Sequence, residues 1–504
     1  MTDDAFGTAA LRAAVLQAWT LSPARLREDA NSEEDHARGY YRDRVVVELA
    51  QNAADAATRA GVPGRLLLRL GEADGRTVLV AANTGAPLDA EGIASLASLR
   101  ASAKRDGRGA TSPVGRFGVG FAAVRSVSDE IAVGSTTGAV RFSLAATAGE
   151  LASLGETHPT LAAEVRRREG SLPALRLPWP GDERPPSGYD TAVVLELRDG
   201  AASAEVRALL AGIGDPLLLA LPGLAEIVVE IDVAGDSSLR RIADVGSRWT
   251  IARGAGTLDL ALLADRPVEE RRARGWRVTW ALPRSPAGSA PSPDRLLASA
   301  FSGAIALPCA DAVRGSSWGS VVHAPTPTEE RSALPALLVA TLPLDPSRRH
   351  VARGALTDAV LDHAAEVYAD LARTVAAAGG DPLALVPAGL PGGPLDAALS
   401  ERIIATLSAT PLLTSPLGAA DADAGADLLE PRRSVALASG IGRDRQAVGE
   451  LSHWAANLVV LGPGQEAPAR VLGVEVRELA DLVEELPTVA APERWLALYA
   501  ALAR

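Results

Sequence analysis

Three polar side chains share one face of a segment with a helical pattern, VVVELAQNAADAA. Glu48, Asn52 and Asp55 are spaced at i, i+4 and i+7, which places them on the same side of an α-helix. An amide oxygen is a hard ligand of the kind that Mg²⁺ prefers, and a nearby carboxylate can take a proton from water. The spacing therefore suits a magnesium-bound triphosphate and its attacking water. A solvated helix face has the same spacing, so this segment alone decides nothing.

Two further segments place small polar residues at strand ends. NTGAP follows the apolar run RTVLVAA, and Gly85 within it lets the backbone approach a ring closely. Thr191 opens a second strand pattern, TAVVLELR. Either one alone reads as an ordinary turn or strand.

A glycine-rich segment, GRFGVGF, leads into the helical pattern AAVRSVS. Backbone amides at a helix start bind phosphate well when no Cβ is in the way, which suits Gly115, Gly118 and Gly120. No βαβ pattern surrounds this segment, so it is not a dinucleotide fingerprint.

Together and in this order, the four segments resemble those of the GHKL superfamily, which includes type II topoisomerases, ninety-kilodalton heat-shock chaperones, histidine kinases and MutL ATPases. ELAQNAADA resembles the N-box, NTGAP the first glycine box and GRFGVGF the second. The resemblance covers about residues 36 to 200 and is nearest to the sacsin-type and chaperone forms. It implies a Bergerat α/β sandwich that binds ATP and Mg²⁺.

The resemblance also implies a role for each matching residue. Glu48 would orient or deprotonate the attacking water, and Asn52 would coordinate Mg²⁺. Asp55 would lie near the base or sugar. Asn83 stands where most members have an aspartate that accepts a hydrogen bond from the adenine amino group, and a carboxamide oxygen accepts it without charge assistance. Thr191 would contact adenine directly or through water.

The remaining implied contacts are to phosphate. The turn that holds the phosphates would consist of Gly115, Phe117, Gly118, Val119 and Gly120. Gly85 belongs to the first glycine box, whose usual second glycine is replaced by Pro87. Lys104, the only lysine of the chain, lies in the segment that forms a lid over ATP in this superfamily, where its charge would reach a phosphate; a solvated loop lysine is an equally good interpretation.

A basic residue from the next domain reaches the γ-phosphate in chaperone-like relatives, and Arg348 or Arg349 in DPSRRHVARG suits this role. A surface turn with two arginines is an equally good interpretation. The first rival function is an ATP-sensing regulatory or defence module without useful turnover. A kinase of the histidine type is disfavoured by the FGVGF form and by the absence of an upstream phospho-acceptor helix pair.

Length and charge limit the remaining possibilities. A chain of 504 residues predicts two to four domains. The patterns indicate an α+β chain: an ATP-binding domain over 1–202, a middle α/β domain over 203–388 and a small mixed C-terminal region over 389–504. That region either ends with the chain or continues in a longer natural protein.

The net charge of -12 disfavours nucleic acid as the main partner. The single cysteine, Cys309, excludes a disulfide within the chain, and the six histidines lack metal-site spacing. No secretory signal or membrane span is evident, so we expect a cytoplasmic protein with an unidentified protein client. Homodimerisation is expected by analogy only.

Overall fold

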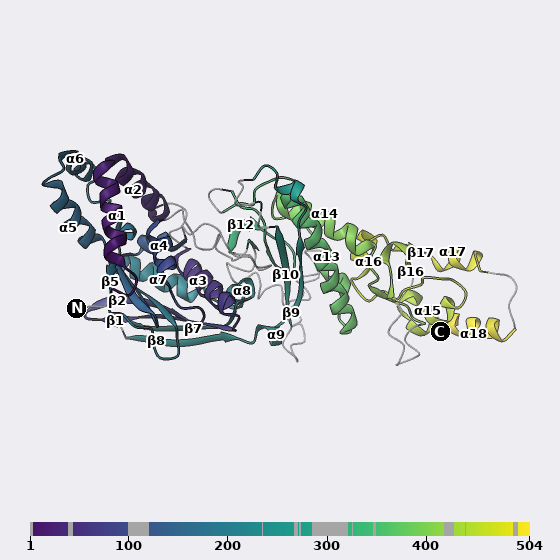
Figure 1. The fold of residues 1–504 in the computed structure, drawn as a ribbon. Helices are drawn as coiled ribbons and strands as arrows, with labels where there is room; N and C mark the ends of the chain where they lie inside the picture. The colour runs from purple at the N-terminus through teal and green to yellow at the C-terminus, as the bar shows by residue number, and fades with distance from the viewer. Residues whose placement is uncertain are drawn as a thin grey trace. The chain divides into compact units, whose positions relative to one another are not determined.

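A computed structural model describes residues 4–38, 44–98, 120–233, 235–266, 271, 274–284, 321–324, 326–345, 349–417, 428–438, 440–486 and 492–503. The chain forms two compact units, Met1–Val245 with Arg266–Gly275 and Gly246–Asp265 with Trp276–Arg504. Both units combine helices with β-sheet, which confirms the α+β class (Figure 1).

The first unit is organised around an eight-stranded sheet with the order β5-β4-β3-β6-β2-β1-β7-β8. Neighbouring strands are antiparallel except β1 and β7, which are parallel. The sheet continues past residue 202, where the sequence patterns placed the end of the first domain. The strands are β1 (Gly64–Ala73), β2 (Arg76–Asn83), β3 (Ser128–Ser135), β4 (Gly138–Ser143), β5 (Trp179–Pro180), β6 (Thr191–Leu197), β7 (Leu224–Val233) and β8 (Asp236–Ala243).

Helices cover one face of this sheet (Figure 1). Helix α3 packs on β1, β2 and β7, while α8 packs on β7 and β8. The helices are α1 (Thr8–Leu21), α2 (Pro23–Arg38), α3 (Val45–Ala60), α4 (Ala90–Ser98), α5 (Leu144–Gly155), α6 (Pro159–Arg167), α7 (Gly200–Ala211) and α8 (Asp215–Ala220), with 3-10 helices η3 (Gly120–Ser126) and η4 (Ala174–Arg176).

The two apolar runs RLLLRLG and RTVLVAAN, on either side of EADG, predict a β-hairpin. The pairing of β1 with β2 confirms it, with a two-residue turn at Asp74 and Gly75. The sequence pattern of ALRLP predicts another strand of this sheet, and that prediction is wrong, because the backbone of Ala174–Arg176 forms η4. There the Glu33 carboxylate accepts hydrogen bonds from the amides of Ala174 and Leu175. The helix expected after the second glycine box is a 3-10 helix.

The second unit contains a five-stranded sheet with the order β12-β11-β13-β10-β9 and a long helix, α13. Its core holds Trp280 against Tyr368, with ring centroids 4.7 Å apart. The elements are α9 (Val245–Arg248), where the units meet in sequence, β9 (Trp249–Thr257), η5 (Leu260–Leu263), β10 (Gly275–Pro283), β11 (Val321–His323), β12 (Pro327–Arg331), β13 (Leu337–Ala340), α13 (Ala355–Ala377), η6 (Pro382–Leu385) and α14 (Pro394–Ser408).

Short elements make up the remainder of the second unit. A two-stranded parallel pair, β16–β17, packs with α15 and α18 around a small apolar cluster that includes Val448, Leu451 and Leu498. The elements are β14 (Leu413–Thr414), β15 (Leu428–Leu429), η7 (Pro431–Arg433), β16 (Val435–Leu437), η8 (Gly440–Arg443), α15 (Arg445–Ser452), α16 (Glu466–Val471), β17 (Glu475–Arg477), α17 (Leu479–Glu484) and α18 (Pro492–Leu502).

Candidate functional site

Helix α3 is buried on almost every side, and Asn52 is the exception. Every other residue from Val45 to Ala57 is buried, including Glu48 at 6% and Asp55 at 2% exposure, whereas Asn52 is half-buried. A buried carboxylate requires polar or charged partners, and both of these carboxylates interact with other groups. The structure therefore presents an accessible carboxamide one turn from a buried carboxylate on the same helix face.

A row of polar residues crosses three neighbouring strands at one end of the sheet. Asn83 on β2 lies directly opposite Thr191 on β6, and Thr191 lies opposite Ser135 on β3. The hydroxyl oxygens of Ser135 and Thr191 are 3.1 Å apart. Residues opposite each other in an antiparallel pair point to the same face of the sheet. The three side chains therefore form one polar row.

The polar row lies on the face of the sheet that the helices cover. Leu66 on β1 is opposite Asn83 and is 1% exposed, whereas Arg65 and Arg69 point to the other face and are exposed. Asn83 is itself buried, with 9% of its surface exposed. Thr191 is half-buried and is therefore more accessible than Asn83.

The turn after Asn83 packs directly on α3. The amide of Ala86 donates to the carbonyl of Ala56 over 3.0 Å. Gly85 has φ +135°, and a Cβ there would lie 2.5 Å from the carbonyl carbon of Ala56. Only glycine fits this position without displacing the helix backbone. The contact brings the NTG turn beside the residue that follows Asp55, so the structure joins the first two sequence segments.

Asn83 presents a hydrogen-bond acceptor in this setting. Its Nδ2 donates to the carbonyl of Thr84 over 3.2 Å. Among the described residues, no hydrogen bond is made to its Oδ1. A carboxamide oxygen with free lone pairs can accept from an amino group of a ligand.

Two residues that the sequence analysis did not select belong to the same cluster. Asp190 accepts a hydrogen bond from the Gly85 amide over 2.8 Å through Oδ2. Ser135 accepts from the Leu88 amide and donates to the carbonyl of Asp190, each over 3.0 Å. Asp190 directly precedes Thr191, and Ser135 ends the strand pattern EIAVGS. Their positions beside predicted strand ends were the only sequence feature that could have indicated that they belong to the site.

Several predicted site residues lie outside the described residues or in the other unit. Lys104, Gly115, Phe117, Gly118, Val119 and Arg348 are outside the described residues. Gly120 begins η3, which packs against α2 and α3. Arg349 belongs to the second unit, where its Nη1 is 2.5 Å from Glu329 Oε1.

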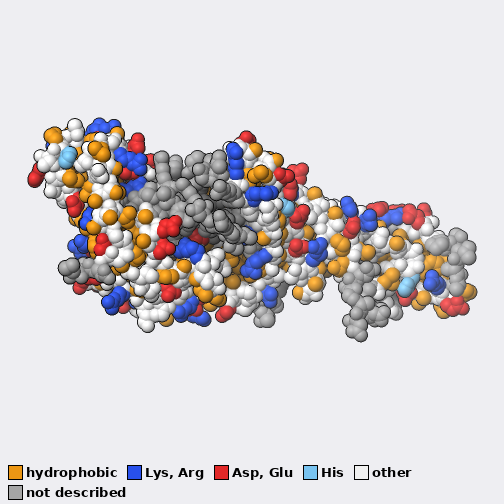
Figure 2. Space-filling view, in the orientation of Figure 1, with side chains coloured by type: hydrophobic (Ala, Val, Ile, Leu, Met, Phe, Trp, Pro, Cys, Tyr) orange, Lys and Arg blue, Asp and Glu red, His pale blue; other side chains and the backbone are white. Residues whose placement is uncertain are grey.

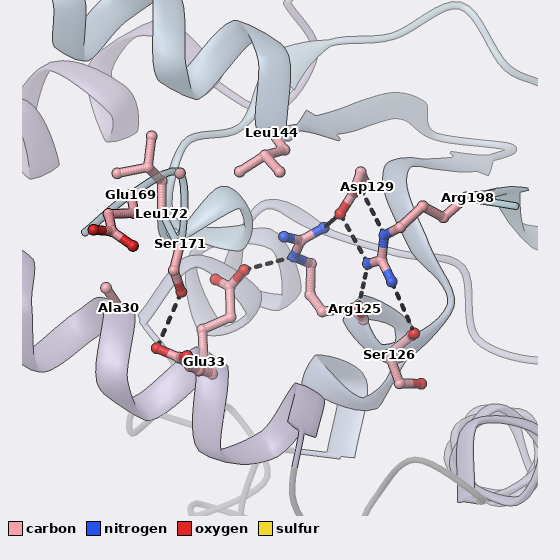
Figure 3. Close-up of a pocket in the computed structure, with 12 residues that line it drawn as sticks. Ala30, Glu33, Arg125, Ser126, Asp129, Leu144, Glu169, Ser171, Leu172 and Arg198 are labelled. Carbon is pink, nitrogen blue, oxygen red and sulfur yellow. Dashed lines mark hydrogen bonds and ion pairs between the residues drawn. The ribbon is translucent and has the colours of Figure 1, made fainter. Parts of the chain in front are cut away.

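A polar pocket of about 540 Å³ lies beside the other end of η3 (Figure 3). Arg125 donates from Nε to Glu33 over 2.9 Å and from Nη1 to the carbonyl of Ser128 over 2.8 Å. Arg198 donates to the carbonyls of Arg125 and Ser126. The network fixes the end of η3 to α2 and to β3.

The acidic members of this network differ in pKa. Burial raises the pKa of Glu33, against the opposing effects of Arg125 and the Leu175 amide. Burial also acts to raise the pKa of Asp129, but hydrogen bonds and charge from Arg198 and Arg125 outweigh it and lower this pKa. Since these acidic side chains are paired with arginines, the network stabilises the local fold.

The described residues contain no group of three or more His, Cys, Asp or Glu side chains that could hold a metal ion. No described helix combines the length and the hydropathy that a membrane span needs. On the face drawn in Figure 2, acidic and basic side chains of the described residues are interspersed, without a broad basic area.

No protein-family model matches the chain, and no curated protein sequence matches it.

Proposed function

We propose that the first unit binds Mg-ATP as a member of the GHKL superfamily, and that slow hydrolysis drives a chaperone-like or sacsin-like conformational cycle. One observation carries the proposal. The NTG turn packs on α3 directly after Asp55, while Asn83 and Thr191 lie opposite each other on the helix-covered face. Four sequence segments far apart in the chain were expected to form one site, and the parts of three of them that are described lie close together.

The described residues suit the two parts of this ligand. The free Oδ1 of Asn83 and the hydroxyl of Thr191 suit the amino edge of adenine. Asn52 supplies one hard oxygen, and Mg²⁺ bound to a nucleotide commonly takes its other ligands from phosphate and water. A cluster of three carboxylates is therefore not required.

In this proposal Glu48 orients or deprotonates the attacking water, one helical turn from Asn52. Asp55 lies near the base or sugar. Gly115, Phe117, Gly118, Val119 and Gly120 hold the phosphates, with Lys104 as a further positive charge. Arg349 would be the basic residue of the next domain that acts on the γ-phosphate, and within the second unit it pairs with Glu329.

The test combines calorimetry of Mg-ATP binding with phosphate release. We expect Glu48→Gln to bind ATP but to lose roughly 10²–10⁴ in turnover, the usual contribution of a general base. Asn52→Ala should lose the magnesium dependence of binding. Arg59→Ala, on the exposed last turn of the same helix, is the matched control and should behave as the wild type.

The outcomes separate the proposals. Turnover that depends on Glu48 supports an ATPase. ATP binding without turnover in the wild type assigns the chain to the alternative, an ATP-sensing regulatory or defence module. The absence of ATP binding in the wild type rejects both.

A further inference from the structure

Asp190 connects three strand ends of the first unit. Its carboxylate accepts from the Gly85 amide over 2.8 Å, and its own amide donates to the carbonyl of Asn83 over 2.9 Å. Its carbonyl accepts from the Ser135 hydroxyl and from the Thr136 amide, each over 3.0 Å. The end of β2, the end of β3 and the start of β6 are therefore bonded to one residue.

Among these hydrogen bonds, only the one from the Gly85 amide uses the side chain of Asp190. Main-chain bonds survive most substitutions, whereas this one requires an acceptor on the side chain of residue 190. Without it the Gly85 amide loses a charge-assisted hydrogen bond, which is stronger than a neutral one. The turn would then keep the Ala86 bond to α3, the two hydrogen bonds between Thr84 and Arg65 on β1, and its packing on α3, but it would have no side-chain bond to β6 at Gly85.

We propose that Asp190 is a positioning residue for the nucleotide: it fixes the NTG turn so that Asn83 and Thr191 meet the base together. The inference rests on the proposed function. Asp190 acts through Gly85 and is not itself required to touch the ligand. Its contribution is preorganisation, because a turn that is already ordered loses less conformational entropy when the nucleotide binds.

Three variants test this inference by calorimetry with Mg-ATP and by thermal unfolding. Asp190→Ala removes the acceptor. Asp190→Asn keeps an acceptor oxygen but removes the charge. Asp199→Ala is the matched control, because Asp199 also accepts from a backbone amide over 2.8 Å, that of Ala202 at the start of α7.

We expect Asp190→Ala to weaken ATP binding about tenfold, the effect of losing one charge-assisted bond. Asp190→Asn should recover most of the affinity. Asp199→Ala should lower the Tm by a similar amount and leave the ATP Kd unchanged. A purely structural role for Asp190 would lower the Tm without changing the Kd.

Two outcomes overturn different statements. If the wild type binds ATP and Asp190→Ala binds it equally well, the positioning role is wrong and the proposed function stands. If the wild type does not bind ATP, the proposed function fails first, and the role of Asp190 fails with it.

Discussion

Asn83 and Thr191 lie directly opposite each other on β2 and β6, although 107 residues separate them in the chain. In the proposed site, a carboxylate at position 83 would accept the adenine amino group with charge assistance, as a carboxamide cannot. We therefore expect Asn83→Asp to tighten ATP binding by about 1 kcal/mol, or several-fold in Kd.

Inosine triphosphate provides the control for this prediction, because its base carries a carbonyl where adenine carries the amino group. Its affinity should not increase in Asn83→Asp. If calorimetry showed an equal gain in affinity for both nucleotides, the carboxylate would not be recognising the amino group.

Replacing Gly85 in the NTG turn should strongly destabilise the first unit. Gly85→Ala introduces a Cβ that would lie 2.5 Å from the backbone of α3 at a φ of +135°. Steric overlap and an unfavourable φ should together lower the free energy of unfolding by about 3 kcal/mol.

Gly75→Ala is the matched comparison, since Gly75 also has a positive φ, +76°, but a Cβ there meets nothing within 4 Å. Its effect should be about 1 kcal/mol in urea unfolding. Equal losses for the two variants would mean that the contact with α3 is not tight.

Part of the fold of the first unit could be predicted from the sequence, because those elements are determined by residues close together in the chain. The β1–β2 hairpin was predicted because two apolar runs flank the turn sequence EADG. The helix that carries Glu48, Asn52 and Asp55 was predicted from the spacing of these residues, and it ends at Gly61. Hydrophobic periodicity and turn residues predict such local elements directly.

The non-local part was not readable. The apolar run that forms β7 lies in the predicted middle domain over 203–388, yet it pairs with β1, more than 150 residues earlier in the chain. The ALRLP segment has strand composition, but a buried carboxylate on another helix binds its amides. β1 is far in sequence from β7, and Glu33 is far from ALRLP. Composition and periodicity describe local structure, so they do not predict these contacts.

Glu33 should be essential to the stability of the first unit. Glu33→Gln removes a buried negative charge that pairs with Arg125 and accepts from two backbone amides. We expect the free energy of unfolding to fall by about 2 kcal/mol, because the bond from Arg125 loses its charge assistance and the neutral amide has one acceptor oxygen for three donors, while Arg125 keeps its ion pair with Asp129.

Glu28→Gln is the control, since Glu28 is exposed on the same helix. It should change stability by less than about 0.5 kcal/mol. Similar effects of the two substitutions in urea unfolding would contradict the importance of the buried network.

Asp129 should make the stability of the first unit sensitive to acid. Arg198 and Arg125 outweigh the effect of burial and lower the pKa of Asp129 below its ordinary value of 3.8. The folded state therefore binds this proton less tightly than the unfolded state, so the stabilisation is present above pH 3.8 and is lost as the pH falls through the folded pKa.

The measurement is urea unfolding of the wild type and Asp129→Asn at several pH values. Because Asp129 is partly exposed, solvent screening limits the expected difference to about 1 kcal/mol at pH 7. The difference should shrink below pH 4. A difference that stays constant down to pH 3 would assign the effect to packing.

The parallel pairing of β1 with β7 has a practical consequence for dissecting the chain. A fragment that ends at residue 202 would lack β7 and leave the backbone of Leu66, Leu67 and Leu68 without the partners that Ile227, Val228 and Val229 provide. Exposed apolar strand edges associate with one another, so this fragment should aggregate. The shortest N-terminal fragment with an intact sheet ends after β8, at Ala243.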